Sequence, residues 1–178
     1  MSCLGLVIAW AAGSAAIVAH GMIFPRSIEE QNLAALARTY KRQLGIHADI
    51  PVMIIKKNER LASVRPYPGR SATYLMEIDE SFLATLSEDE KHAIVAHEVG
   101  HVWIFTHDPY QQSEALANEK AEGLVRQNSL VTLYKKVWAL GGQDGTLAQF
   151  LNQKLGLAGY QDSSTAISAL QSEASQDQ

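Results

Sequence analysis

The feature that most constrains the fold is an apolar helix that carries three ionisable side chains. Ser87 and Glu90 form a capping box, and acidic residues in this first turn suit the positive end of a helix dipole. The helix continues through apolar residues until the turn at 108–109 ends it. Within it, residues 97–101 read His-Glu-Val-Gly-His. These polar groups need partners, because an unpaired polar group is costly to bury.

The spacing of His97 and His101 is that of two metal ligands on one helix. Residues four apart lie on the same face, about 6 Å apart along the axis, so both imidazoles can bind one ion. Glu98 is rotated by roughly 100° and would lie beside the open coordination position, where it could take a proton from metal-bound water. The five-residue pattern also arises by chance, but its apolar flanks favour a zinc site.

A catalytic zinc needs a third protein ligand and one free position. Glu114 lies in the next predicted helix, 111–126, and a tight turn would let that helix fold back so that Glu114 faces the imidazoles. Asn118, one turn later, would lie on the same face and orient a ligand by a hydrogen bond. Glu119 and Glu122 remain rival ligands, because a different helix register would bring either of them to the ion.

The rest of the chain predicts an α+β domain over residues 27–156. It should be small and mostly helical, with a short sheet of about three strands. A capping box at Ser27 and Glu30 begins a first helix that Gly45 should end, and Pro51 suits an edge position for the first strand. The predicted strands are 50–55, 61–65 and 72–78, and the further predicted helices are 131–140 and 146–155.

Two terminal segments differ from this domain. Residues 4–24 carry no formal charge and are long enough to span a bilayer, which predicts one hydrophobic helix, a transmembrane anchor, within 1–26. A cleaved signal peptide, which would make the protein secreted or periplasmic, and a buried core helix are the alternatives. No Lys or Arg precedes the run, which argues against cleavage, and the side of the membrane stays open. Residues 157–178 lack Lys and Arg and predict a disordered tail.

Composition excludes several classes of function. The 178 residues carry 15 basic and 19 acidic side chains, a net charge of −4, and no region is basic enough to bind nucleic acid. The single cysteine, Cys3, can form neither an internal disulfide nor a thiolate metal site. Any metal must therefore be bound by His and carboxylate side chains.

These motifs resemble those of the gluzincin metallopeptidases, zincins in which a His-Glu-x-x-His helix supplies two zinc ligands and a Glu-x-x-Ala-[Asp/Asn] helix supplies the third. The most similar patterns are those of the CAAX-prenyl-protease-like and heat-shock membrane peptidases and of the ImmA/IrrE-type peptidases, over residues 27–130. The prenyl-protease-like pattern ends in Asp where this chain has Asn118, which favours the ImmA/IrrE-like variant or a weaker metal site. The matching residues are Leu86, Ser87, Glu90, 97–101, Glu114, Ala117 and Asn118.

The resemblance implies a zincin-like fold and a membrane-associated, zinc-dependent endopeptidase that acts on a peptide or protein substrate. It implies that His97, His101 and Glu114 are the Zn²⁺ ligands and that Glu98 is the catalytic base that activates metal-bound water. It also implies that residues 72–78 form an edge strand over the cleft, to which a peptide could add as another strand.

Other interpretations stay open. The chain could be a catalytically silent metal-binding interaction module of a membrane assembly, a membrane scaffold without metal, or a helper within a larger membrane assembly. His107 and Tyr110 are the nearest candidates to stabilise an oxyanion, but each is expected to serve the turn or the core instead. Trp103, Tyr134 and Trp138 are interpreted as core residues.

Overall fold

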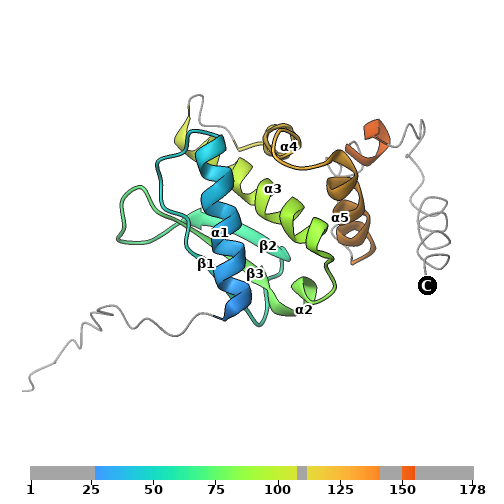
Figure 1. The fold of residues 1–178 in the computed structure, drawn as a ribbon, viewed down its shortest axis with the longest axis horizontal. Coiled ribbons are helices and arrows are strands. Elements are labelled where there is room, and N and C mark those ends of the chain that lie inside the picture. Colours follow the sequence, from blue (N-terminus) through green and yellow to red (C-terminus); the bar gives the residue numbers. More distant parts are fainter. Residues whose placement is uncertain (1–26, 108–111, 141–149, 155–178) are drawn as a thin grey trace, which may run out of the picture.

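The computed structural model describes residues 27–107, 112–140 and 150–154, which form a mixed structure of helices and one small sheet (Figure 1). The predicted membrane segment within 1–26, Tyr110 and the predicted disordered tail 157–178 lie outside the described residues. Within the described ranges, no helix has the length and apolar character needed to cross a bilayer. The elements, in chain order, are α1 (Ile28–Gln43), β1 (Val52–Ile55), β2 (Ala62–Pro66), β3 (Tyr74–Asp79), α2 (Glu80–Leu83), α3 (Glu88–Thr106), α4 (Glu114–Glu122) and α5 (Gln127–Ala139).

The first helix begins and ends where local sequence signals predict. The Ser27 hydroxyl accepts a hydrogen bond from the Glu30 amide, and the Glu30 carboxylate accepts one from the Ser27 amide, both at 3.0 Å. Gly45 follows the last turn with φ +68°, a conformation that glycine adopts without strain. Glu30 also accepts a hydrogen bond from the Ile54 amide at 3.0 Å, which ties the start of α1 to β1.

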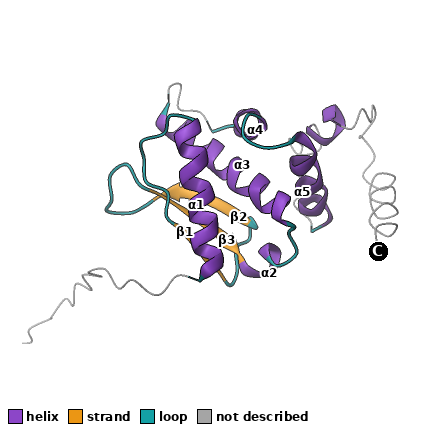
Figure 2. Cartoon of the chain, in the orientation of Figure 1, coloured by secondary structure: helices purple, strands orange, loops and turns teal. Residues whose placement is uncertain are grey.

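The sheet has the strand order β1-β3-β2, with β1 parallel and β2 antiparallel to β3 (Figure 2). The first strand is an edge strand, as Pro51 predicts. The prediction that residues 72–78 form an edge strand is wrong, because β3 pairs with both neighbours. The physical reason is burial: Leu75, Met76 and Ile78 are at most 4% exposed, which suits a central strand, whereas β2 becomes exposed towards its end.

Helix α3 lies at the centre of the packing. It contacts α1, α4, α5 and β2, so its side chains are buried on nearly all sides. Its start agrees with the predicted capping box: the Ser87 amide donates to the Glu90 carboxylate at 2.7 Å, and the Glu90 amide donates back to the Ser87 hydroxyl at 3.4 Å. The short helix α2, which sequence analysis missed, begins where the Asp79 carboxylate accepts a hydrogen bond from the Phe82 amide.

The two helices after α3 differ from their predicted ranges. Helix α4 begins only after Ser113, whose hydroxyl accepts a hydrogen bond from the Leu116 amide at 3.3 Å. Helix α5 begins at Gln127, four residues before the predicted start at 131. The sequence did not indicate this start because no side chain caps the helix. Residues 150–154 are helical, within the predicted range 146–155.

Candidate metal centre

Three side chains from α3 and α4 converge on one point. The Nε2 atoms of His97 and His101 lie 3.1 Å apart. The Glu114 carboxylate lies 3.2 Å from the Nε2 atom of His97 and 3.4 Å from that of His101. Among the described residues, this is the group of ionisable side chains that could hold a metal ion.

The outer ring nitrogens of both histidines face oxygen atoms. His97 Nδ1 lies 2.9 Å from the Asn118 side-chain oxygen and 2.6 Å from the Tyr134 hydroxyl. His101 Nδ1 lies 2.9 Å from the side-chain oxygen of Gln112. An Nδ1–H that donates to such an acceptor leaves the lone pair of a neutral imidazole on Nε2, the atom that points at Glu114. Both rings are therefore oriented as metal ligands are.

The close approach of α4 to α3 depends on Gly100. A Cβ atom at this position would lie 2.6 Å from the Ala117 carbonyl oxygen, closer than real Cβ contacts allow. Ala117 and Ala121 are fully buried in α4, and their small side chains let the helix approach. This contact brings the first turn of α4, with Glu114, beside the two imidazoles. Sequence analysis missed Gly100, although a glycine inside an apolar helix often marks such an approach.

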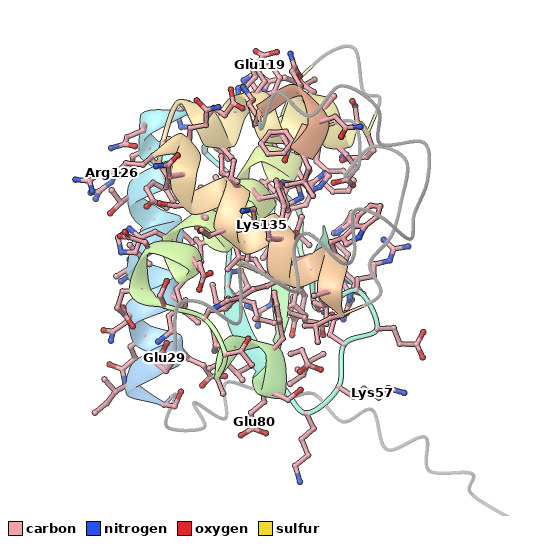
Figure 3. All side chains as sticks on the ribbon, turned by 90° about the vertical axis from the view of Figure 1, so that its right-hand side faces the viewer. Glu29, Lys57, Glu80, Glu119, Arg126 and Lys135 are labelled. Atoms are coloured by element: carbon pink, nitrogen blue, oxygen red, sulfur yellow. The ribbon has the colours of Figure 1, made fainter. Side chains whose placement is uncertain are left out.

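The structure places the rival ligands elsewhere. Glu119 is exposed at the outer surface, at the top of the view in Figure 3, and lies 3.0 Å from Lys120. Glu122 forms an ion pair with Lys154 at 2.6 Å. Neither carboxylate belongs to the cluster of His97, His101 and Glu114.

Glu98 lies beside this cluster at the wall of a cavity of about 700 Å³. The side chain is buried, and no hydrogen bond or ion pair holds its carboxylate among the residues that the structure describes. Burial raises the pKa of Glu98, although the charges of His97 and His101 oppose that shift. A carboxylate with a raised pKa accepts a proton more readily than an exposed carboxylate does.

The imidazoles and Glu114 also affect one another's protonation. Burial disfavours the charged form of His101, but its hydrogen bond to Glu114 and the Glu98 charge outweigh burial and raise its pKa to about 9. The hydrogen bonds from His101 and His97 hold the pKa of the Glu114 carboxyl well below its usual range. Without a metal, the imidazoles thus donate hydrogen bonds to Glu114, and a cation that binds there must displace these protons.

The cavity is bounded on one side by the sheet. Ala62, Ser63 and Val64 of the edge strand β2 line it, as do Arg60 and Phe105. On the opposite side it reaches Leu133 and other residues of α5. The strand beside the cluster of His97, His101 and Glu114 is thus β2 and not the predicted strand 72–78.

His107 and Tyr134 both lie near the site, but only Tyr134 contacts one of the candidate ligands. His107 stacks on Trp103 with ring centroids 4.3 Å apart, and its Nδ1 atom lies 2.8 Å from the Trp103 carbonyl oxygen. Tyr134 is buried, as predicted for a core residue, but its hydroxyl also meets His97 and Asn118. That second contact joins residues 37 positions apart, and no local pattern signals it.

No family model matches this chain, and neither a curated protein nor a solved structure is significantly similar to it. Its function is therefore inferred from the chemistry of the site itself.

Proposed function

We propose that the protein is a zinc-dependent peptidase with a zincin-like domain, in which His97, His101 and Glu114 bind the metal and Glu98 is the catalytic base. One observation carries the proposal: the Nε2 atoms of His97 and His101 lie 3.1 Å apart, and the two carboxylate oxygens of Glu114 lie 3.2 Å from the first and 3.4 Å from the second. Zinc–ligand bonds of about 2.0–2.1 Å in a tetrahedron set ligand atoms about 3.3 Å apart. The observed separations, which involve both oxygens of Glu114, are close to this value, and one ligand atom from each residue lies within 4.8 Å of the other two, which favours one shared zinc ion.

The donor set also favours zinc over harder cations. Two imidazole nitrogens and one carboxylate suit Zn²⁺, whereas Ca²⁺ and Mg²⁺ prefer oxygen ligands. Three protein ligands leave one position open, as in catalytic rather than structural zinc sites. The hydrogen bonds to His97 Nδ1 and His101 Nδ1 supply the outer partners that ligating histidines usually have.

Glu98 supports hydrolysis rather than metal storage. When bound at such a site, zinc lowers the pKa of water towards about 7 and polarises a carbonyl group. Glu98 follows the ligand His97 directly, and its buried carboxylate lines the cavity. It accepts a proton from the attacking water and passes that proton to the amine that leaves. A metal site without catalysis would not need a buried carboxylate at this position.

The free edge of β2 supports a peptide as the substrate. A strand at the edge of a sheet offers unpaired amides and carbonyls, to which an extended peptide can add. Residues 62–64 of this strand line the same cavity as Glu98. A peptide bound along β2 would therefore carry its backbone past the metal cluster. The uncharged run at residues 4–24 further supports a place at a membrane, as an anchor or as an export signal.

Hydrolysis and metal content, measured together, test this proposal. We expect the zinc-loaded full-length protein to cleave members of a mixed peptide library, detected by mass spectrometry. Glu98→Gln should bind one zinc ion per chain but lose at least about 100-fold in rate, because the amide cannot accept the proton. Glu114→Gln should lose zinc as well as activity, because an amide is a weaker ligand than a carboxylate.

The two variants separate the alternatives. Equal cleavage by the wild-type protein and Glu98→Gln would contradict the catalytic role. Stoichiometric zinc with no cleavage of any peptide would favour the silent metal-binding module. A wild-type protein without zinc after metal-replete expression would contradict the metal site itself. Glu119→Gln is the matched control, since this exposed carboxylate in the same helix pairs only with Lys120 among the described residues.

A further inference from the structure

We propose that Tyr134 is a positioning residue: through Asn118 it fixes the tautomer of His97 that can bind metal. This inference rests on the proposed metal site, and it assigns a role to α5, which supplies no ligand. Tyr134, Asn118 and His97 come from three different helices, α5, α4 and α3. Their polar atoms meet at a single buried point behind the imidazole.

All three atoms at this point are within hydrogen-bond distance of one another. His97 Nδ1 lies 2.6 Å from the Tyr134 hydroxyl and 2.9 Å from the Asn118 oxygen, and the Tyr134 hydroxyl donates a short hydrogen bond to that same oxygen. Each of the three residues is at most 8% exposed, so water offers little alternative to these partners.

Counting protons at the three atoms shows which arrangement a metal ion on His97 requires. If the Tyr134 hydroxyl donates to the Asn118 oxygen, then His97 Nδ1 carries a proton and donates it to one of the two oxygens. Each of the three atoms then has a partner of the right kind, and the His97 lone pair on Nε2 is available to a metal ion bound between His97 and Glu114. If the hydroxyl instead donates to Nδ1, the Asn118 oxygen faces only lone pairs, and Nε2 carries a proton that blocks metal binding.

Asn118 needs this help because its side chain is a neutral amide. A carboxylate at this position would accept a hydrogen bond from Nδ1 in either orientation, but an amide can turn its NH₂ group towards the ring and favour the wrong tautomer. The hydrogen bond from Tyr134 holds the amide oxygen in place. Tyr134 thus compensates for the charge that a carboxylate would supply.

The surroundings of Tyr134 keep its hydroxyl in position. Its ring packs edge-on against His97 and Phe150, with centroids 5.7 and 4.9 Å away. Lys136, two residues after Tyr134 in α5, donates a hydrogen bond to the buried Glu90 carboxylate of α3 at 2.7 Å. The position of α5 is therefore set by contacts on both sides of the tyrosine.

The chain contains a matched control. Tyr40 is also buried, at 5% exposure, and its hydroxyl lies 2.9 Å from Nδ1 of another α3 histidine, His92. Tyr40→Phe and Tyr134→Phe remove the same hydroxyl from the same kind of contact. If tyrosine contributes only stability, the two variants should behave alike.

The first experiment measures zinc affinity of the full-length protein by competition with a chromogenic chelator. We expect Tyr134→Phe to weaken zinc binding by about 10- to 100-fold, the usual effect of losing an outer partner of a ligand. Tyr40→Phe should change zinc affinity by less than about 2-fold. Folding of both variants is checked by circular dichroism. Folded Tyr134→Phe with wild-type zinc affinity would overturn the proposal and leave the metal site intact.

Two further measurements address the mechanism. In the Asn118→Asp background, Tyr134→Phe should weaken zinc binding by less than about 3-fold, because a carboxylate needs no orientation; an undiminished effect would contradict the role through Asn118. Long-range ¹H–¹⁵N NMR spectra of the zinc-loaded protein show which ring nitrogen of His97 keeps its proton. We expect this proton on Nδ1, where the Asn118 oxygen accepts it. A proton on Nε2, with zinc bound through Nδ1, would overturn the proposal whatever the zinc affinities are.

Discussion

Helix α3 carries two histidines that each meet a buried tyrosine, and only one of them belongs to the site. The Tyr40 hydroxyl lies 2.9 Å from His92 Nδ1, and the Tyr134 hydroxyl lies 2.6 Å from His97 Nδ1. In both pairs the rings are steeply inclined, at 71° and 86°. The two histidines therefore have similar contacts with their tyrosines, in both distance and ring angle.

The difference lies on the other side of each ring. His97 Nε2 faces a second imidazole and a carboxylate, at 3.1 and 3.2 Å. His92 belongs to no such cluster in the described part of the chain. A histidine held by a tyrosine is thus an ordinary packing contact, and it is the convergence of further ligand atoms, brought by α4, that distinguishes a candidate metal site. Substitutions in these contacts change either the convergence of the ligand atoms or the packing alone.

The largest effect is expected at the contact that brings α4 to α3. Gly100→Ala should displace α4, because the new Cβ atom would lie 2.6 Å from the Ala117 carbonyl oxygen, which is backbone and cannot rotate away. We expect zinc affinity to fall by more than about 100-fold and the free energy of unfolding to fall by about 2 kcal/mol. Chelator competition and urea denaturation measure the two changes.

Gly123→Ala is the control for that substitution. Its Cβ atom would lie 3.4 Å from the Lys120 carbonyl oxygen, an ordinary contact, and the backbone there is helical. This variant should keep wild-type zinc affinity. If Gly100→Ala also bound zinc normally, close helix approach would not be what positions Glu114.

The ion pair between α5 and the start of α3 should affect stability without altering the ligands. Lys136 lies 2.7 Å from Glu90, whose side chain is 5% exposed. Lys136→Met leaves that carboxylate without its cation, and we expect the free energy of unfolding to fall by about 2 kcal/mol. The expected change is smaller than for a fully buried ion pair because Lys136 is partly exposed. Urea denaturation should show this loss, whereas the exposed Lys57→Met should change stability by less than about 0.5 kcal/mol.

Asp79 connects the sheet to the wall of the cavity and should make stability depend on pH. Its carboxylate accepts hydrogen bonds from Ser81, the Phe82 amide and the Asn58 amide, which lower its pKa to about 2. A lowered pKa stabilises the fold above the unfolded pKa of about 4, and this contribution disappears as the pH falls to about 2. Asp79→Asn should therefore cost about 1.5 kcal/mol at neutral pH and almost nothing at pH 2. A difference from the wild-type protein that stayed constant over this range would contradict the assignment.

The smallest effect is expected at the histidine outside the cluster. His92→Gln removes the hydrogen bond to Tyr40 and should lower the free energy of unfolding by about 1 kcal/mol. Zinc affinity and peptide cleavage should stay at wild-type values. Loss of zinc from His92→Gln would mean that the two Tyr–His pairs do not differ in function as their surroundings indicate.

Local signals made much of this fold predictable. The capping boxes at Ser27 and Ser87 involve residues three apart, so they can be recognised without any tertiary contact. The spacing of His97 and His101 follows from helix geometry in the same way. Glu114 was placed beside them by assuming a tight turn, and the rival carboxylates could be separated from it only by the actual helix register.

Contacts between distant segments were not predictable from such signals. The order of the strands depends on which of them buries both faces, and the edge position expected for residues 72–78 came from the family resemblance and not from their own apolar pattern. The contact of Tyr134 with His97 depends on how α5 packs against α3 and α4, and its start has no capping side chain to mark it. The fold class and the spacing of the two histidines could therefore be predicted from the sequence. The residues that form hydrogen bonds to the candidate ligands, such as Tyr134, could be identified only from the structure.

X-ray absorption spectroscopy at the zinc K edge tests the central claim most directly. For the zinc-loaded full-length protein, we expect one zinc ion with two imidazole nitrogens and about two oxygen ligands, all at about 2.0–2.1 Å. Glu114→Gln and His97→Ala should each lose this spectrum, and His92→Gln should retain it. A wild-type spectrum with fewer than two imidazole ligands, or with six oxygen ligands typical of a surface ion, would contradict the account.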